Sequence, residues 1–208
     1  MLLQILYKIY KILYNEKEIM KKFILASGSP RRKDILLRED YDFDIVTSDK
    51  EDVFDKTCSA DKFSVRCAIS KAGDVYSRSD KSSVVLGADT VVALGGEILG
   101  KPKDITEAEE MLRRLSGKTH AVTTGYAVYT ENFFQTGSVT TEVEFENLTD
   151  EVLNAYLKSG LWQGKAGAYG IQDGFPLVKS FKGDRDNVVG LPIAEIKPVI
   201  DLLLGAEK

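Results

Sequence analysis

Hydrophobic and polar positions follow two different periods along most of this chain. Short runs rich in β-branched residues, separated by glycines and turn residues, predict strands at 22–27, 82–95, 120–130 and 138–148. Apolar residues spaced three to four positions apart predict helices at 29–39, 61–78, 104–117, 148–160 and 191–205. The pattern predicts a mixed α/β chain, without an internal repeat or a linker that marks a domain boundary.

The first residues, MLLQILYKIYKILYNEKEIMKK, have a different pattern. They give an apolar helical face, but Lys8 and Lys11 keep the run well short of the roughly 20 apolar residues that a membrane span needs. A secretory signal would carry its charge earlier and end in small residues. An interfacial membrane helix stays open. Because Met20 directly precedes a strand-like segment, we expect residues 1–19 to be an appendage or a mis-assigned start, and residues 20–208 to be one domain.

Composition excludes several classes of protein. The 208 residues are 43% hydrophobic, which is enough for one large core or two small lobes. The formal net charge of −4 argues against a broad nucleic-acid surface, so a basic cluster is a local device. Cys58 and Cys67 are too few for a disulfide framework or a zinc site, and this usage favours free thiols in a reducing compartment.

The segment ILASGSPRRKDILL places hydroxyls and arginines where a strand meets a helix. Ser29 is a good N-cap and Pro30 suits the first helical position. The free N–H groups and positive dipole end of such a helix would point toward Ser27, and the guanidinium groups of Arg31 and Arg32 match phosphate oxygens. The segment therefore predicts an anion-binding site, or else a capped helix with two solvated arginines.

Asp89 interrupts an otherwise apolar strand, where a carboxylate is costly without a partner. It could bind a divalent metal, act as a general base on water, or pair with a lysine. Nearby, Gly95, Gly100 and Lys101 match the start of a phosphate-binding P-loop, but Pro102 replaces the Ser or Thr that holds the metal. We exclude the P-loop and keep Lys101 as a phosphate-binding candidate.

Other polar residues lie between and after these segments. The acidic run SDKEDVFDK offers Asp49, Glu51 and Asp52, and one carboxylate of this run could share a magnesium ion with Asp89. Lys71 follows on a predicted helix. The one histidine, His120, lies in a strand-like segment, where we expect a structural role, so Ser-His or Cys-His hydrolysis is poorly supported. Gln172, in a glycine-dense stretch, could read a base edge or lie exposed in a loop.

Five ordered motifs resemble those of the Maf family of nucleoside triphosphate pyrophosphatases. They are LASGSPRRKDIL, GADTVVALGGEILGKP, LRRLSGKTHAVTTGYAV, KAGAYGIQ and NVVGLPI. The resemblance implies an elongated mixed sheet with flanking helices and two lobes around a central cleft, as in inosine triphosphate pyrophosphatases. It also implies a cytoplasmic enzyme, often a homodimer, that uses Mg²⁺ or Mn²⁺ to cut nucleoside triphosphates into monophosphate and pyrophosphate. Members are associated with septum inhibition or with sanitising nucleotide pools.

The resemblance assigns roles position by position. It implies phosphate binding by Ser27, Ser29, Arg31 and Arg32, a proton-accepting and metal-binding Asp89, supporting lysines at Lys71 and Lys101, and a metal carboxylate at Asp52 or Glu51. The residues tied to base choice are Arg31, Thr90 and Gln172. GADT and AGAYGIQ are similar to the branch acting on dTTP and UTP, although Asp173 stands where a glycine normally follows the glutamine. The alternatives are 7-methyl-GTP or modified nucleotides as substrates, or a non-catalytic nucleotide-binding regulator of septum formation.

Overall fold

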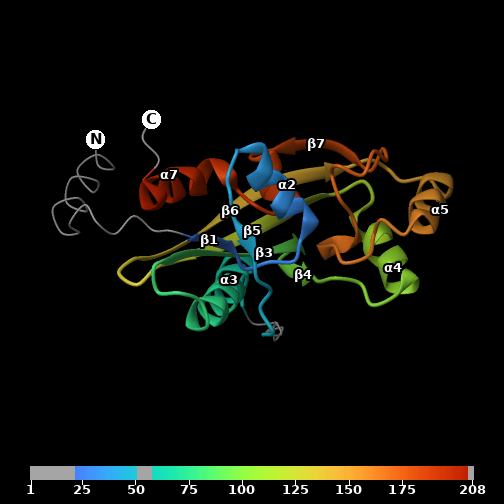
Figure 1. Ribbon diagram of the computed structural model, residues 1–208. Coiled ribbons are helices and arrows are strands. Elements are labelled where there is room, and N and C mark those ends of the chain that lie inside the picture. Colours follow the sequence, from blue (N-terminus) through green and yellow to red (C-terminus); the bar gives the residue numbers. More distant parts are fainter. Residues whose placement is uncertain (1–21, 51–57, 206–208) are drawn as a thin grey trace.

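The computed structural model describes residues 22–50 and 58–205, which build one mixed sheet with helices on both faces (Figure 1). The strands are β1 (Lys22–Leu25), β2 (Asp44–Ile45), β3 (Ser83–Leu94), β4 (Glu97–Leu99), β5 (Thr119–Tyr129), β6 (Phe134–Phe145) and β7 (Val178–Lys182). The helices are α2 (Pro30–Arg38), α3 (Ala60–Ser77), α4 (Ile105–Leu115), α5 (Asp150–Ser159), the 3₁₀ turn η1 (Ala166–Ala168), α6 (Arg185–Val189) and α7 (Ile193–Leu204). Every strand and helix predicted from hydrophobic periodicity is present, with ends shifted by a few residues.

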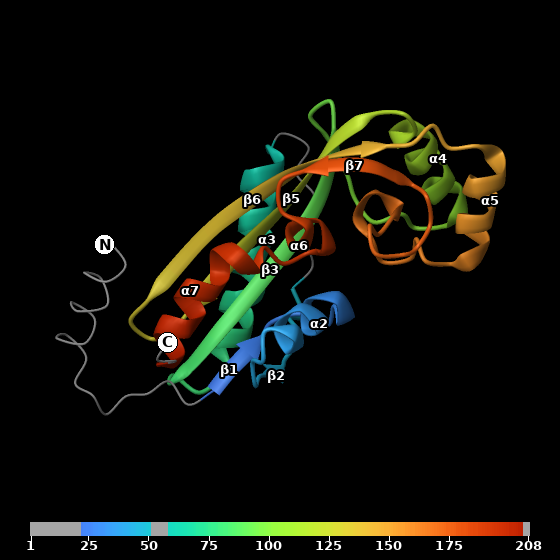
Figure 2. The ribbon, with the colours of Figure 1, turned by 90° about the horizontal axis from the view of Figure 1, so that it is seen from above.

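The sheet has the strand order β2-β1-β3-β5-β6-β7, and β4 pairs with β3 outside this path. Strand β1 runs parallel to β2 and β3, whereas the pairs β3/β5, β5/β6 and β6/β7 are antiparallel. Strands β3, β5 and β6 run much of the length of an elongated molecule (Figure 2). The predicted elongated mixed sheet is confirmed.

Alternate residues of β3 pack against different layers, as the two-residue period of a strand requires. Leu86 joins a cluster with Leu36 of α2 and Ile196 of α7. Its neighbour Val85 joins a second cluster with Ala72 of α3. Helices α7 and α3 accordingly lie on opposite faces of the sheet (Figure 1), so the run of apolar residues in β3 reflects burial on both sides.

A separate hydrophobic cluster fills the other end of the molecule. It contains Leu112 of α4, Val122 of β5 and Leu153 of α5. Helices α4 and α5 lie together at this end, away from α7 and β1 (Figure 2). The long strands continue through both regions, which form the two predicted lobes on one shared sheet.

Two glycines let α3 approach the sheet closely. A Cβ atom added at Gly87 would lie 2.6 Å from the carbonyl oxygen of Ala68, and one at Gly125 would lie 2.3 Å from the backbone nitrogen of Val65. Both contacts are with helix backbone, which cannot rotate away as a side chain can. The hydrogen atoms of these glycines therefore set how closely α3 packs against β3 and β5.

The sequence pattern did not predict β2, β7 or α6. Strand β7 is an edge strand whose residues are mostly exposed, so no alternation of apolar and polar positions marks it. The predicted appendage at residues 1–19 lies outside the described residues. No helix in the described part of the chain is long and apolar enough to cross a membrane.

Candidate active site

A cavity of about 510 Å³ lies between the two lobes. On one side it is bounded by Ala26 and Val189, and on the other by Val92, Val122 and Tyr169. The structure brings to this cavity the predicted site residues Ser27, Ser29, Arg31, Arg32, Lys71, Asp89, Thr90, Lys101 and Gln172. The predicted metal-binding carboxylates Glu51 and Asp52 lie outside the described residues.

The junction of β1 and α2 supplies the anion-binding part of the cavity. Ser29 is the N-cap residue with an extended backbone, and Pro30 occupies the first helical turn, as predicted. The Ser29 side chain makes no capping hydrogen bond, while its backbone N–H donates to Oγ of Ser27 at 3.3 Å. Because the first N–H groups of a helix have no partner within the helix, this end of α2 provides donors for an anion.

The two adjacent arginines have different surroundings. Arg32 donates from Nε to the carbonyl oxygen of Gly190 at 2.8 Å, and from its terminal nitrogens to Oγ of Ser27 at 2.9 Å and Oγ1 of Thr90 at 3.1 Å. The Arg31 side chain has no hydrogen-bond partner among residues 22–50 and 58–205, and burial lowers its pKa, opposed by the charge of Asp173. Arg32 therefore holds the walls of the cavity together, whereas Arg31 offers its guanidinium donors to a ligand.

Asp89 of β3 and Lys71 of α3 form an ion pair inside the cavity. Nζ of Lys71 lies 2.6 Å from Oδ1 of Asp89, and the two side chains are 15% and 10% exposed. Oδ2 of Asp89 has no hydrogen-bond partner within the described residues. Of the three roles expected for Asp89, the structure shows the pairing with a lysine. The second carboxylate oxygen is available for a proton or a cation.

The hydroxyl of Thr90 is engaged within the protein. Besides the bond from Arg32, Oγ1 lies 2.9 Å from Oγ1 of Thr124 and donates weakly to the carbonyl oxygen of Gly190 at 3.5 Å. Thr90 thus supports the position of Arg32, while it also lines the cavity.

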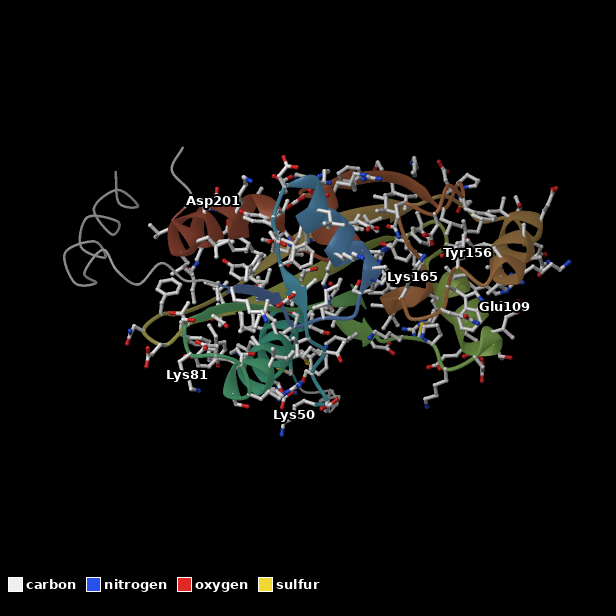
Figure 3. All side chains as sticks on the ribbon, viewed as in Figure 1. Lys50, Lys81, Glu109, Tyr156, Lys165 and Asp201 are labelled. Carbon is white, nitrogen blue, oxygen red and sulfur yellow. The ribbon has the colours of Figure 1, made fainter. Side chains whose placement is uncertain are left out.

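A second set of polar residues was missed by the sequence analysis. Buried Lys165 forms an ion pair with Oδ2 of Asp173, which also accepts a hydrogen bond of 2.6 Å from the hydroxyl of Tyr156. Nε2 of Gln172 donates to Oδ1 of Asp173 at 3.1 Å. Lys165 and Tyr156 lie close together toward the α5 end of the molecule (Figure 3). Only the position of Asp173 beside Gln172 could have drawn attention to this network.

His120 supports the wall of the cavity from behind. Its Nε2 lies 2.7 Å from the hydroxyl of Tyr169, and its ring packs edge-on against Phe145 and Tyr169. Burial lowers the pKa of His120 to about 4. The imidazole is therefore neutral at pH 7, and the predicted structural role is confirmed.

A comparison with models of protein families shows which family this chain belongs to. The model described as Maf-like protein matches residues 22–202. The chain belongs to the Maf family. The fold and the cavity described above are therefore those of a Maf-like protein.

Curated relatives of this Maf-like chain cover most of its length. A dTTP/UTP pyrophosphatase of Pyrococcus furiosus is 44% identical over 186 residues, covering 88% of this chain and 96% of the relative. A dTTP/UTP pyrophosphatase of Bacillus cytotoxicus is 46% identical over 178 residues, covering 85% and 93%. A crystal structure of a nucleoside-triphosphatase, a dITP/XTP pyrophosphatase from Mycobacterium abscessus, aligns with a TM-score of 0.44 at 15% identity over 89% of this chain and 100% of that chain.

The divalent metal implied by the Maf resemblance can be tested against the donors of the cavity. Among its described lining residues, Asp89 is the one carboxylate, and no group of three or more His, Cys, Asp or Glu side chains occurs in the described part of the chain. Magnesium commonly takes one or two carboxylates and completes its shell with phosphate oxygens and water. Asp89 therefore fits as one ligand of a metal that a bound triphosphate helps to hold.

Proposed function

We propose that this Maf-family chain hydrolyses dTTP and UTP to the nucleoside monophosphate and pyrophosphate. The observation that carries the proposal is the largely buried Asp89–Lys71 pair in a cavity that is also lined by the N-terminus of α2. The names of the curated relatives support both the reaction and the two substrates.

The triphosphate binds at the β1–α2 junction. The N–H groups at the start of α2 and the Ser29 hydroxyl donate hydrogen bonds to the phosphate oxygens, and Arg31 and Lys101 supply positive charge. Arg32 keeps Ser27 in place through the 2.9 Å hydrogen bond. These groups are in position before the substrate arrives, so they also stabilise the charge that develops on the leaving pyrophosphate.

The chemical step is attack of water on the α-phosphorus. The water oxygen forms the new P–O bond, the bond from the α-phosphorus to the bridging oxygen breaks, and pyrophosphate leaves with the electron pair. Asp89 accepts the proton of the attacking water. Lys71 orients Asp89 through the 2.6 Å contact at Oδ1.

A bound Mg²⁺ or Mn²⁺ would be held by Asp89 together with a carboxylate of the acidic loop, Glu51 or Asp52, and would supply charge neutralisation at the phosphate oxygens. We further propose that the enzyme works in the cytoplasm as a homodimer. The two cysteines, which the structure contains as free thiols, suit a reducing compartment.

The proposal is tested by incubating the full-length protein with dTTP, UTP, CTP, GTP, ATP and 7-methyl-GTP, each with magnesium or manganese, and identifying both products by chromatography. Monophosphate with pyrophosphate from dTTP and UTP is the expected result. Preferential turnover of 7-methyl-GTP would overturn the substrate assignment. Nucleotide binding without pyrophosphate release would overturn the enzymatic assignment and favour a regulator that acts by contact.

A further inference from the structure

We propose that Asp173 is the residue that makes the cavity select bases with an N3–H group, because it fixes the orientation of the Gln172 amide. The inference rests on the proposed function and adds a positioning residue to it. Thymine and uracil carry a hydrogen at N3, whereas cytosine carries a lone pair there and an amino group at C4. A side-chain amide can match either pattern, depending on which of its two ends faces the base.

The contacts of Asp173 define which end faces the base. Its Oδ1 accepts from Nε2 of Gln172 at 3.1 Å. An ionised carboxylate has no hydrogen to donate, so only the NH₂ end of the glutamine amide is stable beside it. The carbonyl oxygen Oε1 is then the end of the amide left to accept from a base in the cavity that Gln172 lines.

Two other donors hold the Asp173 carboxylate in place. Lys165 pairs with its Oδ2, and the Tyr156 hydroxyl donates to the same oxygen at 2.6 Å. The Lys165 and Asp173 side chains are only 9% and 5% exposed, so water does not compete strongly for either charge. Oδ1 remains for Gln172, and each carboxylate oxygen therefore has its own set of donors.

Gly170 leaves the space that this arrangement needs. A Cβ atom at Gly170 would lie 2.5 Å from Nε2 of Gln172 and 2.7 Å from Oδ1 of Asp173. The turn is closed by the backbone N–H of Asp173 donating to the carbonyl oxygen of Gly170 at 3.1 Å. The amide and the carboxylate thus pack over a bare backbone, and a larger residue at position 170 would displace them.

The matching base follows from hydrogen-bond chemistry. An outward-facing Oε1 accepts from N3–H of uracil or thymine. With cytosine, the same oxygen would face the lone pair of N3, and this acceptor–acceptor contact disfavours the base. The orientation imposed by Asp173 therefore favours UTP and dTTP over CTP.

The variant Asp173→Asn tests the inference because it keeps the shape and reverses the hydrogen-bond pattern. Two donors, Lys165 and Tyr156, meet the Oδ2 position, so the asparagine oxygen is expected there and its NH₂ group is expected to face Gln172. The Gln172 amide must then turn around and present its NH₂ end to the cavity. We expect the ratio of kcat/KM for UTP to that for CTP to fall by at least about tenfold, the loss of one well-placed hydrogen bond.

The double variant Asp173→Asn with Gln172→Ala is the control, compared with Gln172→Ala alone. If Asp173 acts through the glutamine, the UTP/CTP ratio is the same in these two proteins. Gln172→Ala also provides a test that does not depend on folding of the Asp173 variant, since Gln172 is exposed; its UTP/CTP ratio is expected to fall as well.

The outcomes separate this inference from the proposed function. Absence of pyrimidine triphosphate turnover by the unaltered protein would reject the proposed function itself. Normal turnover by the unaltered protein, with equal losses for UTP and CTP in Asp173→Asn, would assign Asp173 a purely structural role and overturn the inference. An unchanged UTP/CTP ratio in Gln172→Ala would overturn it too.

Discussion

The two ends of the cavity are built in different ways. The phosphate side consists of the β1–α2 junction with the Asp89–Lys71 pair, and most of its donors come from one short segment of chain and the start of one helix. The base side consists of the Lys165–Asp173–Tyr156 network with Gln172, held by side chains from a helix and the loop that follows it. In the proposed function, backbone geometry therefore determines where a phosphate binds, whereas the orientation of side chains determines which base is accepted.

Asp89→Asn gives the largest expected effect and acts on the phosphate side alone. Loss of the proton acceptor should lower kcat for dTTP by roughly 10²–10⁴-fold. Since Asp89 does not contact the base in this proposal, kcat for UTP and for CTP should fall by the same factor. Steady-state kinetics with the three nucleotides measure this, with circular dichroism to verify the fold. A kcat close to that of the unaltered protein would remove Asp89 from the chemical step.

Lys165→Met should mainly destabilise the base side. It leaves the Asp173 carboxylate buried without its cation, a change that typically costs about 3–5 kcal/mol of unfolding free energy. Urea denaturation measures the loss. The double variant with Asp173→Asn removes the unpaired charge and should recover much of the stability. If Lys165→Met alone is as stable as the unaltered protein, the ion pair does not hold the base side together.

Substitutions of the two adjacent arginines should have different effects, one mainly on stability and the other mainly on substrate binding. Arg32→Ala removes three hydrogen bonds, including those to Gly190 and Ser27, and should lower the unfolding free energy by about 2–3 kcal/mol. Arg31→Ala should change it by less than about 0.5 kcal/mol and raise KM for dTTP about tenfold, as expected for losing one charged contact to phosphate. Urea denaturation and steady-state kinetics on both variants test this; equal behaviour of the two would contradict the division of roles.

The smallest expected effect concerns the support behind the base side. Burial lowers the pKa of His120 from about 6.5 to about 4. Between these two pH values the imidazole is therefore mostly neutral in the folded protein and mostly protonated in the unfolded chain. Stability from this group is complete above pH 6.5 and is lost as the pH falls toward 4, with about 1 kcal/mol lost by pH 5.5. Urea denaturation at pH 7.5 and 5.5 should show this difference, and His120→Asn should reduce it. An equal pH dependence in the variant would assign the loss to other groups.

The sequence predicted the phosphate side better than the base side, for a physical reason. The Ser-Pro-Arg-Arg junction and the carboxylate of Asp89 are polar groups beside apolar runs. Such a mismatch between a residue and its sequence neighbours can be recognised from the sequence alone. Lys165 and Tyr156 show no such conflict, because lysine and tyrosine are ordinary in loops and helices. Their importance arises only from their meeting at Asp173, which no periodicity encodes.

The same distinction explains the partial prediction of the fold. Strands β3 and β5 and helix α4 have long, regular apolar patterns and were predicted nearly to their ends. Strand β7 is exposed at the sheet edge, and α6 is only five residues long, so neither buries enough apolar surface to leave a pattern. The different roles of Arg31 and Arg32 were equally invisible, because they depend on distant Gly190 and Thr90.

The close packing of α3 on Gly87 and Gly125 constrains how this protein can change. Helix α3 carries Lys71 to Asp89 on β3, so the spacing between helix and sheet also affects where Lys71 stands relative to Asp89. No amino acid is smaller than glycine. Any substitution at Gly87 or Gly125 can only widen the gap between α3 and the sheet. Such a substitution would shift Lys71 relative to Asp89, although neither glycine is proposed to touch the nucleotide.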